Sequence, residues 1–335
     1  MTVQAMAAMA QGAPVEPWAF TLGELGPYDC VLKVKSCGIC HSDLHMIDND
    51  WGAARYPLVP GHEVVGEVVE FGAQVTTLKA GDRLGVGWQS GSCHQCDDCL
   101  RGNENLCSRS QGLITHGRGG FAEYVRVDAR FAFPIPDGIP DHVAGPLLCG
   151  GATVYSALRY AGMSGGQRIG VLGVGGLGHM AVQFAARLGN QVTVFTTSSD
   201  KAELATQLGA SDVVVVPPGE SPPRARKRFH ILLNTVPHHS DWSAYLQQLD
   251  SDGTLSFVGV PLEPAQIPLG LLLGKRRRIM ASAIGSPWMI REMLDLADRH
   301  GIAPRVETFP LADANAALDR VRSNAVRFRA VLVPG

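Results

Sequence analysis

A glycine-rich segment at residues 171–178 constrains the fold of this chain more than any other feature. It follows a predicted strand at 167–172 and opens a predicted helix, so its glycines occupy a strand-to-helix turn. In such a turn Gly173 would permit the tight bend, Gly175 would let the backbone approach a pyrophosphate, and Gly178 would allow close helix–strand packing. This context predicts a dinucleotide site, and a glycine-rich turn without a ligand is the alternative.

Alternating strand and helix patterns surround this turn. Gly176 and Leu177 begin its helix, where backbone N–H groups and the positive end of the helix dipole suit phosphates. Further strands are predicted at 191–195, 212–216, 231–234 and 255–260, with helices at 155–159, 177–188 and 201–208. Such a series predicts an α/β domain, doubly wound around a parallel sheet that is covered on both faces.

The first third of the chain has a different texture. Short β-branched runs punctuated by glycine, with loops that carry Cys and His, predict an antiparallel, barrel-like domain from 31–35, 64–71, 83–86 and 122–127. After Arg278 come two predicted helices, at 287–299 and 312–323, and a strand at 329–332 that could return to this sheet. We expect a catalytic domain at 1–143, completed by 281–335, and a dinucleotide domain at 144–280.

The end of the second α/β strand bears on the choice of dinucleotide. NAD-binding chains usually place Asp or Glu there, whereas here hydroxyls and a lysine follow Phe195, namely Thr196, Thr197, Ser198, Ser199 and Lys201. Hydroxyl donors and an ammonium suit a 2′-phosphate, which a carboxylate would repel. Asp200 is interpreted as the cap of the next helix. The pattern favours NADP over NAD.

Four cysteines in one loop, Cys93, Cys96, Cys99 and Cys107, have the spacing x2, x2, x7. Four thiolates at short spacing fit a closed, tetrahedral structural zinc site. An iron–sulfur cluster is the rival, but the ferredoxin run closes after three residues with Cys-Pro, and this one closes after seven. The spacing favours zinc, with His94 as a bystander.

The other site-forming residues are ambiguous when taken singly. Cys37, Cys40, His62 and Cys149 are scattered, and a buried Cys is usually a small hydrophobic residue. Together they are compatible with a metal site built from distant segments.

At this point a family resemblance becomes specific. The segments CGICHSDLHMIDNDWG, YPLVPGHEVVGEVVEFG, GPLLCGGATVYSAL and GVGGLGHMAVQFA, with the four-cysteine loop, resemble the zinc-containing medium-chain alcohol dehydrogenases. Within these, they are most similar to the cinnamyl alcohol dehydrogenase group and broad-range bacterial aldehyde reductases. The resemblance runs from about residue 31 to the C-terminus. It implies a GroES-like, partly open β-barrel domain beside a Rossmann domain.

The resemblance implies roles for particular residues. The catalytic zinc ligands would be Cys40, His62 and Cys149, with Glu63 as a carboxylate that can replace bound water. Cys37 would have no role in metal binding. Asp43 would orient His62, while Ser42 and His45 would form the proton relay. The cofactor contacts would be His41 on the pyrophosphate and Thr153 near the nicotinamide.

The implied reaction interconverts alcohols and aldehydes. Trp51 and Trp88 lie near metal-bearing segments, where the family lines its substrate pocket; filling of the barrel core is the alternative, and Trp288 is a further candidate. An aromatic wall would favour aryl, allylic or aliphatic aldehydes over polyols. An NAD-dependent polyol or secondary-alcohol dehydrogenase, and a non-catalytic dinucleotide-binding zinc sensor, are the rival functions.

Charge and composition limit the partners. The net charge is −2, so nucleic acid is not an expected partner, and the basic runs 224–228 and 275–278 are interpreted as solvated. No apolar run approaches the length of a membrane span. Clustered cysteines without a signal peptide suggest a cytoplasmic protein. By analogy with the family we expect a homodimer, formed through sheet edges such as 255–260 and the stretch 267–273.

Overall fold

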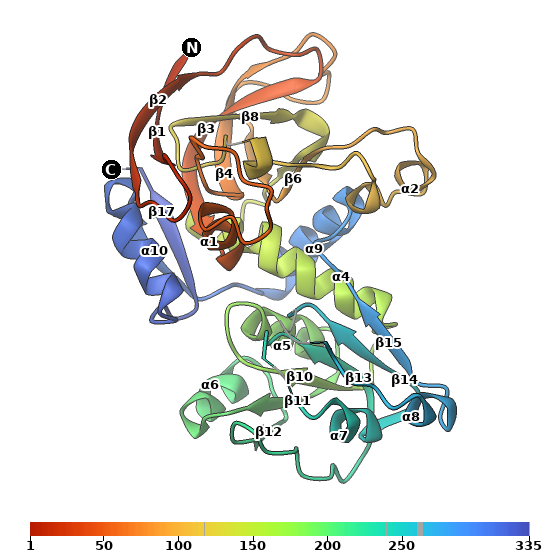
Figure 1. The fold of residues 1–335 in the computed structure, drawn as a ribbon. Coiled ribbons are helices and arrows are strands. Elements are labelled where there is room, and N and C mark those ends of the chain that lie inside the picture. Colours follow the sequence, from red (N-terminus) through yellow and green to blue (C-terminus); the bar gives the residue numbers. More distant parts are fainter. Residues whose placement is uncertain (117, 239, 260–263, 335) are drawn as a thin grey trace. The chain divides into compact units, whose positions relative to one another are not determined.

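The computed structural model describes residues 1–116, 118–238, 240–259 and 264–334. They form two compact units, Met1–Cys149 with Gly285–Gly335 as unit 1 and Gly150–Ile284 as unit 2 (Figure 1). These divisions fall a few residues after the expected ones at 143/144 and 280/281. The expected domain boundaries stay a prediction.

Unit 1 is built on a mixed sheet of seven strands. In order they are β16 (Val306–Pro310), β17 (Arg329–Val333), β3 (Asp29–Ile39), β4 (Glu63–Phe71), β5 (Arg83–Val86) and β9 (Ala132–Pro134), with β8 (Tyr124–Asp128) also paired to β3. All pairs are antiparallel except β16 with β17. The last strand, β17, does return to this sheet, because Ala330 pairs with Ile39 of β3.

The N-terminal segment forms a hairpin that the sequence did not predict. Strand β1 (Thr2–Ala8) pairs antiparallel with β2 (Val15–Thr21). Ala5 bridges to Ala122, and Ala8 bridges to Leu58. Alternate residues of β1 are buried, so it covers part of the core of unit 1. Only Thr2 and Val3 of this strand are β-branched, and the alanines that follow carry little β signal.

Helices and a second small hairpin complete unit 1. The helices are α1 (His41–Ile47), α2 (Asp97–Leu100), α3 (Asp141–Pro146), α9 (Pro287–His300) and α10 (Ala314–Arg322), and the hairpin joins β6 (Gln89–Gly91) to β7 (Gln111–Gly112). The longest helix, α9, starts with Pro287 in its first turn and ends at Gly301, whose φ of +62° suits glycine. Both ends match the helix predicted at 287–299 to within one residue.

Unit 2 is a parallel sheet of six strands with helices between them. The sheet order is β12 (Asp212–Val215), β11 (Gln191–Thr196), β10 (Arg168–Leu172), β13 (Phe229–Asn234), β14 (Leu249–Phe257) and β15 (Arg278–Ala281). Numbered within the unit this is 3-2-1-4-5-6, the order of the dinucleotide-binding fold. The helices are α4 (Ala152–Tyr160), α5 (Gly178–Arg187), α6 (Ala202–Gln207), α7 (Trp242–Gln247) and α8 (Leu269–Leu273).

One expectation about unit 2 is wrong. Residues 255–257 belong to the inner strand β14, so they form no sheet edge, and 260 lies outside the described residues; the edges are β12 and β15. The stretch 267–273 contains the helix α8, and its role in a dimer stays a prediction. The basic run 275–278 is exposed, as interpreted, except at Arg277, which is buried and donates to the carbonyl oxygens of Leu249 and Leu271.

Among the described helices, none combines the length and apolar character that crossing a bilayer requires.

Candidate functional site

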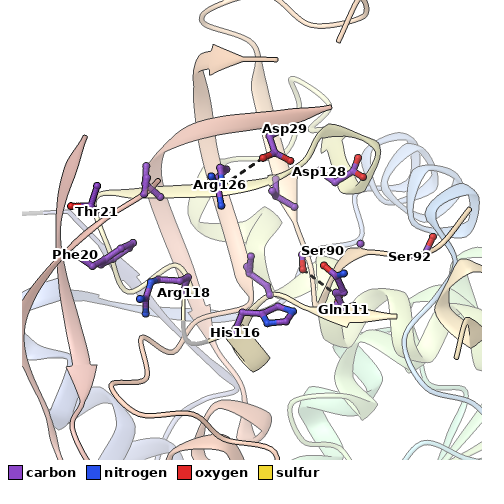
Figure 2. Close-up of a pocket in the computed structure, with 14 residues that line it drawn as sticks. Phe20, Thr21, Asp29, Ser90, Ser92, Gln111, His116, Arg118, Arg126 and Asp128 are labelled. Atoms are coloured by element: carbon purple, nitrogen blue, oxygen red, sulfur yellow. Dashed lines mark hydrogen bonds and ion pairs between the residues drawn. The ribbon is translucent and has the colours of Figure 1, made fainter. Parts of the chain in front are cut away.

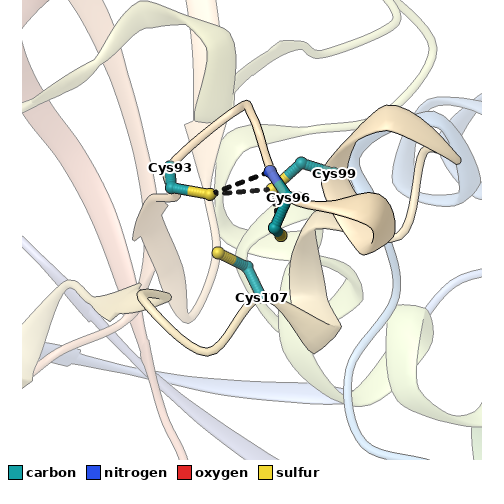
Figure 3. Close-up of side chains that lie close together, drawn as sticks. All are labelled: Cys93, Cys96, Cys99 and Cys107. Atoms are coloured by element: carbon teal, nitrogen blue, oxygen red, sulfur yellow. Dashed lines mark hydrogen bonds between the residues drawn. The ribbon is translucent and has the colours of Figure 1, made fainter.

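The four-cysteine loop closes around one point. The Sγ atoms of Cys93, Cys96, Cys99 and Cys107 all lie within 4.8 Å of one another (Figure 3). The Cys96–Cys99 distance is 3.5 Å and the Cys93–Cys99 distance 3.9 Å. Zinc–sulfur bonds of about 2.3 Å in a tetrahedron place sulfurs roughly 3.8 Å apart. The cluster therefore fits zinc, and all eight cysteines are free rather than disulfide-bonded.

Backbone amides prepare this loop for metal binding. The N–H groups of Gln95 and Cys96 point at the Sγ of Cys93, at 3.5 and 3.3 Å, and they lower the pKa of Cys93 to about 5. The thiolate, which is the form that binds metal, is thus favoured before a metal arrives. His94 lies 3.7 Å from Asp128 and is outside the cluster, in agreement with its interpretation as a bystander.

A second cluster brings together residues far apart in the sequence. Ligand atoms of Cys40, His62, Glu63 and Cys149 lie within 4.8 Å of one another. Cys40 is the N-cap of α1, His62 and Glu63 lie at the start of β4, and Cys149 lies in the π-helical turn Leu147–Gly151. Two thiols, an imidazole and a carboxylate fit a catalytic zinc site with one exchangeable position.

The side chain of Asp43 is hydrogen-bonded to the segments that carry the cluster's ligands. Its carboxylate is fully buried and accepts hydrogen bonds from the N–H groups of Cys40 (2.8 Å) and Gly61 (2.9 Å). It also contacts Nδ1 of His62 at 2.9 Å. Because a carboxylate only accepts, His62 donates from Nδ1 and keeps Nε2 available toward Cys149, 3.3 Å away.

Neighbouring groups shift the pKa values of Cys40 and His62. The contacts with Cys149, His62 and Arg329 hold the pKa of Cys40 well below its ordinary value, although burial opposes them. Burial alone would lower the pKa of His62, but Asp43 raises it well above the ordinary value. Metal binding requires the thiolate and the neutral imidazole. The contacts of Cys40 favour the thiolate, and Asp43 makes the imidazole of His62 a stronger ligand that gives up its proton when a metal binds.

The expected relay residues share helix α1. Ser42 Oγ lies 3.7 Å from Cys40 Sγ, and His45 follows one turn later. Sequence reasoning missed Asp50, whose Oδ2 is 2.6 Å from Nδ1 of His45. The carboxylate can only accept, so His45 donates from Nδ1 and its Nε2 is left for proton transfer. The sequence offers only proximity as a signal, since Asp50 lies just after α1, five residues beyond His45.

Trp51 and Trp88 line one side of this cluster. The ring of Trp88 lies 5.2 Å from His62 and 5.8 Å from Trp51, and Trp51 lies 5.1 Å from His45. Trp51 is 50% exposed, so it does not fill the barrel core, whereas Trp88 is partly buried against the core. Trp288, the weaker candidate, would contact a Cβ on Gly102, beside the four-cysteine loop.

The glycine-rich turn in unit 2 has the geometry that its sequence predicts. Gly173 has a φ of +91°, and a Cβ on Gly178 would lie 2.0 Å from the carbonyl oxygen of Gly173. A Cβ on Gly175 would meet nothing within 4 Å, so the backbone there is open to a ligand. Helix α5 starts directly after Leu177, in line with a phosphate site at Gly176 and Leu177.

The turn after β11 exposes hydroxyls and a cation. Thr197, Ser199 and Lys201 are exposed, whereas Thr196 is buried with its hydroxyl 3.4 Å from the backbone of Ser198. The helix cap is Ser198, which accepts from the N–H of Asp200; the interpretation of Asp200 as the cap is wrong. No carboxylate other than that of Asp200 occurs in this turn.

Four further residues differ in their relation to the two clusters. His41 is exposed at the start of α1, and Thr153 is buried in α4. Cys37 is buried outside both clusters. Sequence reasoning missed Arg329, whose guanidinium contacts the Glu63 carboxylate. Nothing in the local sequence near Arg329 indicates this partner, because β17 reaches β3 only through the fold.

A cavity of about 500 Å³ lies elsewhere in unit 1 (Figure 2). It is lined by polar side chains that include His116, Arg118, Arg126 and Asp29. Arg126 and Asp29 already form an ion pair across it, at 3.6 Å. None of the metal, relay or cofactor residues expected from the sequence lines this cavity.

Fold and clusters together define a zinc-binding dehydrogenase, and comparisons with known proteins agree. Residues 26–137 match the alcohol dehydrogenase GroES-like domain, and residues 176–299 match the zinc-binding dehydrogenase family. Aldehyde reductase AdhA of Synechocystis is 40% identical over 330 residues, covering 98% of each chain. NADP-dependent alcohol dehydrogenase C of Mycobacterium tuberculosis is 38% identical over 339 residues, covering 99% of this chain and 98% of that one.

A solved structure extends the agreement to the whole fold. The cinnamyl alcohol dehydrogenase of Sorghum bicolor superposes with a TM-score of 0.90 at 37% identity, covering 99% of this chain and 98% of that one. The chain belongs to the zinc-containing alcohol dehydrogenase family, with a GroES-like domain and a Rossmann domain. The resemblance inferred from the motifs is confirmed.

We predict that Cys107→Ser removes one of two bound zinc ions and leaves the other, because only the four-cysteine cluster loses a ligand. Metal analysis per chain measures this. Cys37→Ser is the matched control, since Cys37 is a buried cysteine outside both clusters, and it should keep both ions. Equal zinc contents for the two variants would contradict the assignment.

We predict that Asp43→Asn weakens metal binding at the second cluster by about 10- to 100-fold, the usual cost of losing a carboxylate behind a ligand His. Competition with a chelator measures the affinity. Asp48→Asn is the control, because Asp48 pairs with Arg322 at the surface. The assignment fails if both variants retain metal equally well.

Proposed function

We propose that the protein is a zinc-dependent oxidoreductase that interconverts primary alcohols and aldehydes with NADP(H). The observation that carries this proposal is the convergence of Cys40, His62 and Cys149, with Asp43 bonded to the imidazole behind them. Three such ligands leave a position for a substrate oxygen, which distinguishes a catalytic zinc site from the closed four-cysteine site. The names of the relatives support the same reaction class.

Each side chain then has a defined task. When bound, zinc supplies Lewis acidity toward the substrate oxygen, and the nicotinamide supplies or accepts the hydride. Ser42 exchanges a proton with the substrate oxygen, and His45 exchanges it onward toward solvent. Asp50 fixes the imidazole of His45 through Nδ1 and so reserves Nε2 for that transfer. His41 and Thr153 are proposed contacts to pyrophosphate and nicotinamide.

The proposed cofactor preference depends on the turn after β11. Thr197, Ser199 and Lys201 offer exposed donors to a 2′-phosphate, and Ser198 shapes the turn as its cap. A charge-assisted hydrogen bond of this kind contributes roughly 1.5–3 kcal/mol. The Mycobacterium relative is named as NADP-dependent, which supports the same choice.

The proposed substrates are aromatic, allylic or aliphatic aldehydes. Trp51 presents an exposed aromatic face beside His45, and Trp88 places a second ring against His62. Apolar substrate groups gain more from such rings than polyol hydroxyls do. The names of the Synechocystis and Sorghum relatives, an aldehyde reductase and a cinnamyl alcohol dehydrogenase, agree with this class.

We further propose a cytoplasmic homodimer. Eight free cysteines, six of them in metal-type clusters, suit a reducing compartment. The exposed edge strand β15 and the exposed residues Leu269 and Leu273 of α8 offer an apolar contact surface on unit 2.

Steady-state rates with NADPH and NADH against a panel of aldehydes and polyols test the proposal. We expect kcat/KM with NADPH to exceed that with NADH by at least about tenfold, and Lys201→Ala to remove most of that difference. Lys227→Ala is the control, because that lysine lies in the basic run 224–228, outside the turn after β11. A preference for NADH, or equal rates on sorbitol and aryl aldehydes, would refute the respective parts of the proposal.

Ser42→Ala separates an enzyme from a dinucleotide-binding sensor. We expect turnover to fall by about 100-fold or more while both zinc ions and NADPH stay bound, because only the proton path is broken. Unchanged turnover would reject the relay. Complete absence of turnover in the unchanged protein would favour the sensor.

A further inference from the structure

A buried ion pair lies directly beside the catalytic cluster. Glu63 is fully buried and Arg329 is 5% exposed, and Nη2 of Arg329 donates to Oε1 of Glu63. Strand β17 places Arg329 there, because Ala330 pairs with Ile39, which precedes Cys40. A guanidinium is therefore held beside a carboxylate that is itself next in sequence to His62.

The two oxygens of Glu63 have different surroundings. Oε1 is bound to Arg329, whereas Oε2 is buried and has no hydrogen-bond partner among the described residues. A buried carboxylate oxygen without a donor is costly in a folded protein, so within the described part of the chain only Arg329 holds this carboxylate in place. A Glu63 oxygen lies within 4.8 Å of the ligand atoms of Cys40, His62 and Cys149, so a metal ion bound by them would attract the carboxylate in competition with Arg329.

The backbone reserves space for this carboxylate. Gly38 pairs with Glu63 across β3 and β4, and a Cβ on Gly38 would lie 2.0 Å from Oε2. A Cβ on Gly145 would lie 2.6 Å from the carbonyl oxygen of Glu63. Both glycines leave room for Glu63 at a point where any other residue would displace it.

Charge balance determines which partner Glu63 keeps. Two thiolates neutralise the two charges of a divalent ion, which leaves the metal half of the site with the single negative charge of the buried Asp43, while Arg329 neutralises Glu63. If Glu63 moved fully onto the metal, that half would carry a charge of −2 and Arg329 would lose its contact. Separated buried charges of this kind are strongly unfavourable.

We propose, on the basis of the function proposed above, that Arg329 is a positioning residue that retains Glu63 beside the catalytic metal. Its guanidinium keeps the fourth ligand position available to a substrate oxygen. Without it, Glu63 occupies that position and competes with external ligands. The resemblance to the family gave a role to Glu63 alone, and the structure assigns its control to Arg329.

Cobalt(II) in place of the catalytic zinc provides a test that needs no turnover. Its visible absorption reports the ligand set, and titration with imidazole reports how open the fourth position is. We expect Arg329→Gln to weaken imidazole binding by about tenfold or more, in the range typical for groups behind metal ligands. The double variant Arg329→Gln/Glu63→Gln should restore the original affinity, because an amide competes poorly for the metal.

Matched variants keep the test decisive. Arg320→Gln breaks the half-exposed pair between Arg320 and Glu307 in the same unit and should leave imidazole binding unchanged. Glu63→Gln alone should also leave it nearly unchanged, since Arg329 already keeps Glu63 off the metal. A clear gain in imidazole affinity in this single variant would overturn the inference even if Arg329→Gln does not fold.

Two results would overturn the inference. One is unchanged imidazole affinity and absorption in folded Arg329→Gln. The other is a gain of about tenfold or more in Glu63→Gln, which would show that Glu63 ligates the metal despite Arg329. Failure of the unchanged protein to bind cobalt at Cys40, His62 and Cys149 would instead refute the proposed function.

Discussion

The buried carboxylate of Asp43 is the interaction on which the catalytic half of this structure depends. It bonds to the N–H of Cys40 at the start of α1, to the N–H of Gly61, and to Nδ1 of His62. One side chain thus joins the helix that carries the relay to the segment that carries the metal-binding imidazole. Because it is fully buried and accepts three hydrogen bonds, its charge is compensated without solvent.

The two metal clusters stabilise the thiolate form of a cysteine by different physical means. In the four-cysteine loop, backbone N–H groups lower the pKa of Cys93 at a partly exposed site. In the catalytic cluster, side-chain contacts with Cys149, His62 and Arg329 do the same for Cys40 against the cost of burial. The first arrangement can be encoded in one loop, whereas the second requires several segments to meet. This difference explains why the loop was interpretable from spacing and the catalytic cluster was not.

Local patterns predicted much of the fold. The alternating strand and helix patterns around the glycine-rich turn predicted the parallel sheet of unit 2. Within the turn, the positive φ of Gly173 and the close approach of Gly178 to the carbonyl oxygen of Gly173 explain why glycines stand there. The N-terminal hairpin was missed, since the alanines of β1 carry little β signal and Pro17 interrupts the pattern of β2. The inner position of β14 was missed as well, because strand order is decided by packing along the whole sheet rather than by the strand itself.

Within the site, the limit of prediction was the long-range partner. Spacing identified the four-cysteine cluster, and the family resemblance supplied Cys40, His62 and Cys149. Neither indicated Arg329, which comes within reach of Glu63 through strand pairing across 266 residues. Asp50 is only five residues from His45 in the sequence, but a carboxylate near a histidine is too common in sequences to be singled out without geometry.

Zinc X-ray absorption spectroscopy on the metal-loaded protein tests the central claim most directly, because it counts the atoms bound to the metal. The account predicts two zinc ions per chain, one with four sulfurs and one with two sulfurs and lighter atoms, hence an average of three sulfurs per zinc. In Cys107→Ser, which keeps only the catalytic ion, the average should fall to two. A single ion in the unchanged protein, or an average of four sulfurs, would contradict it.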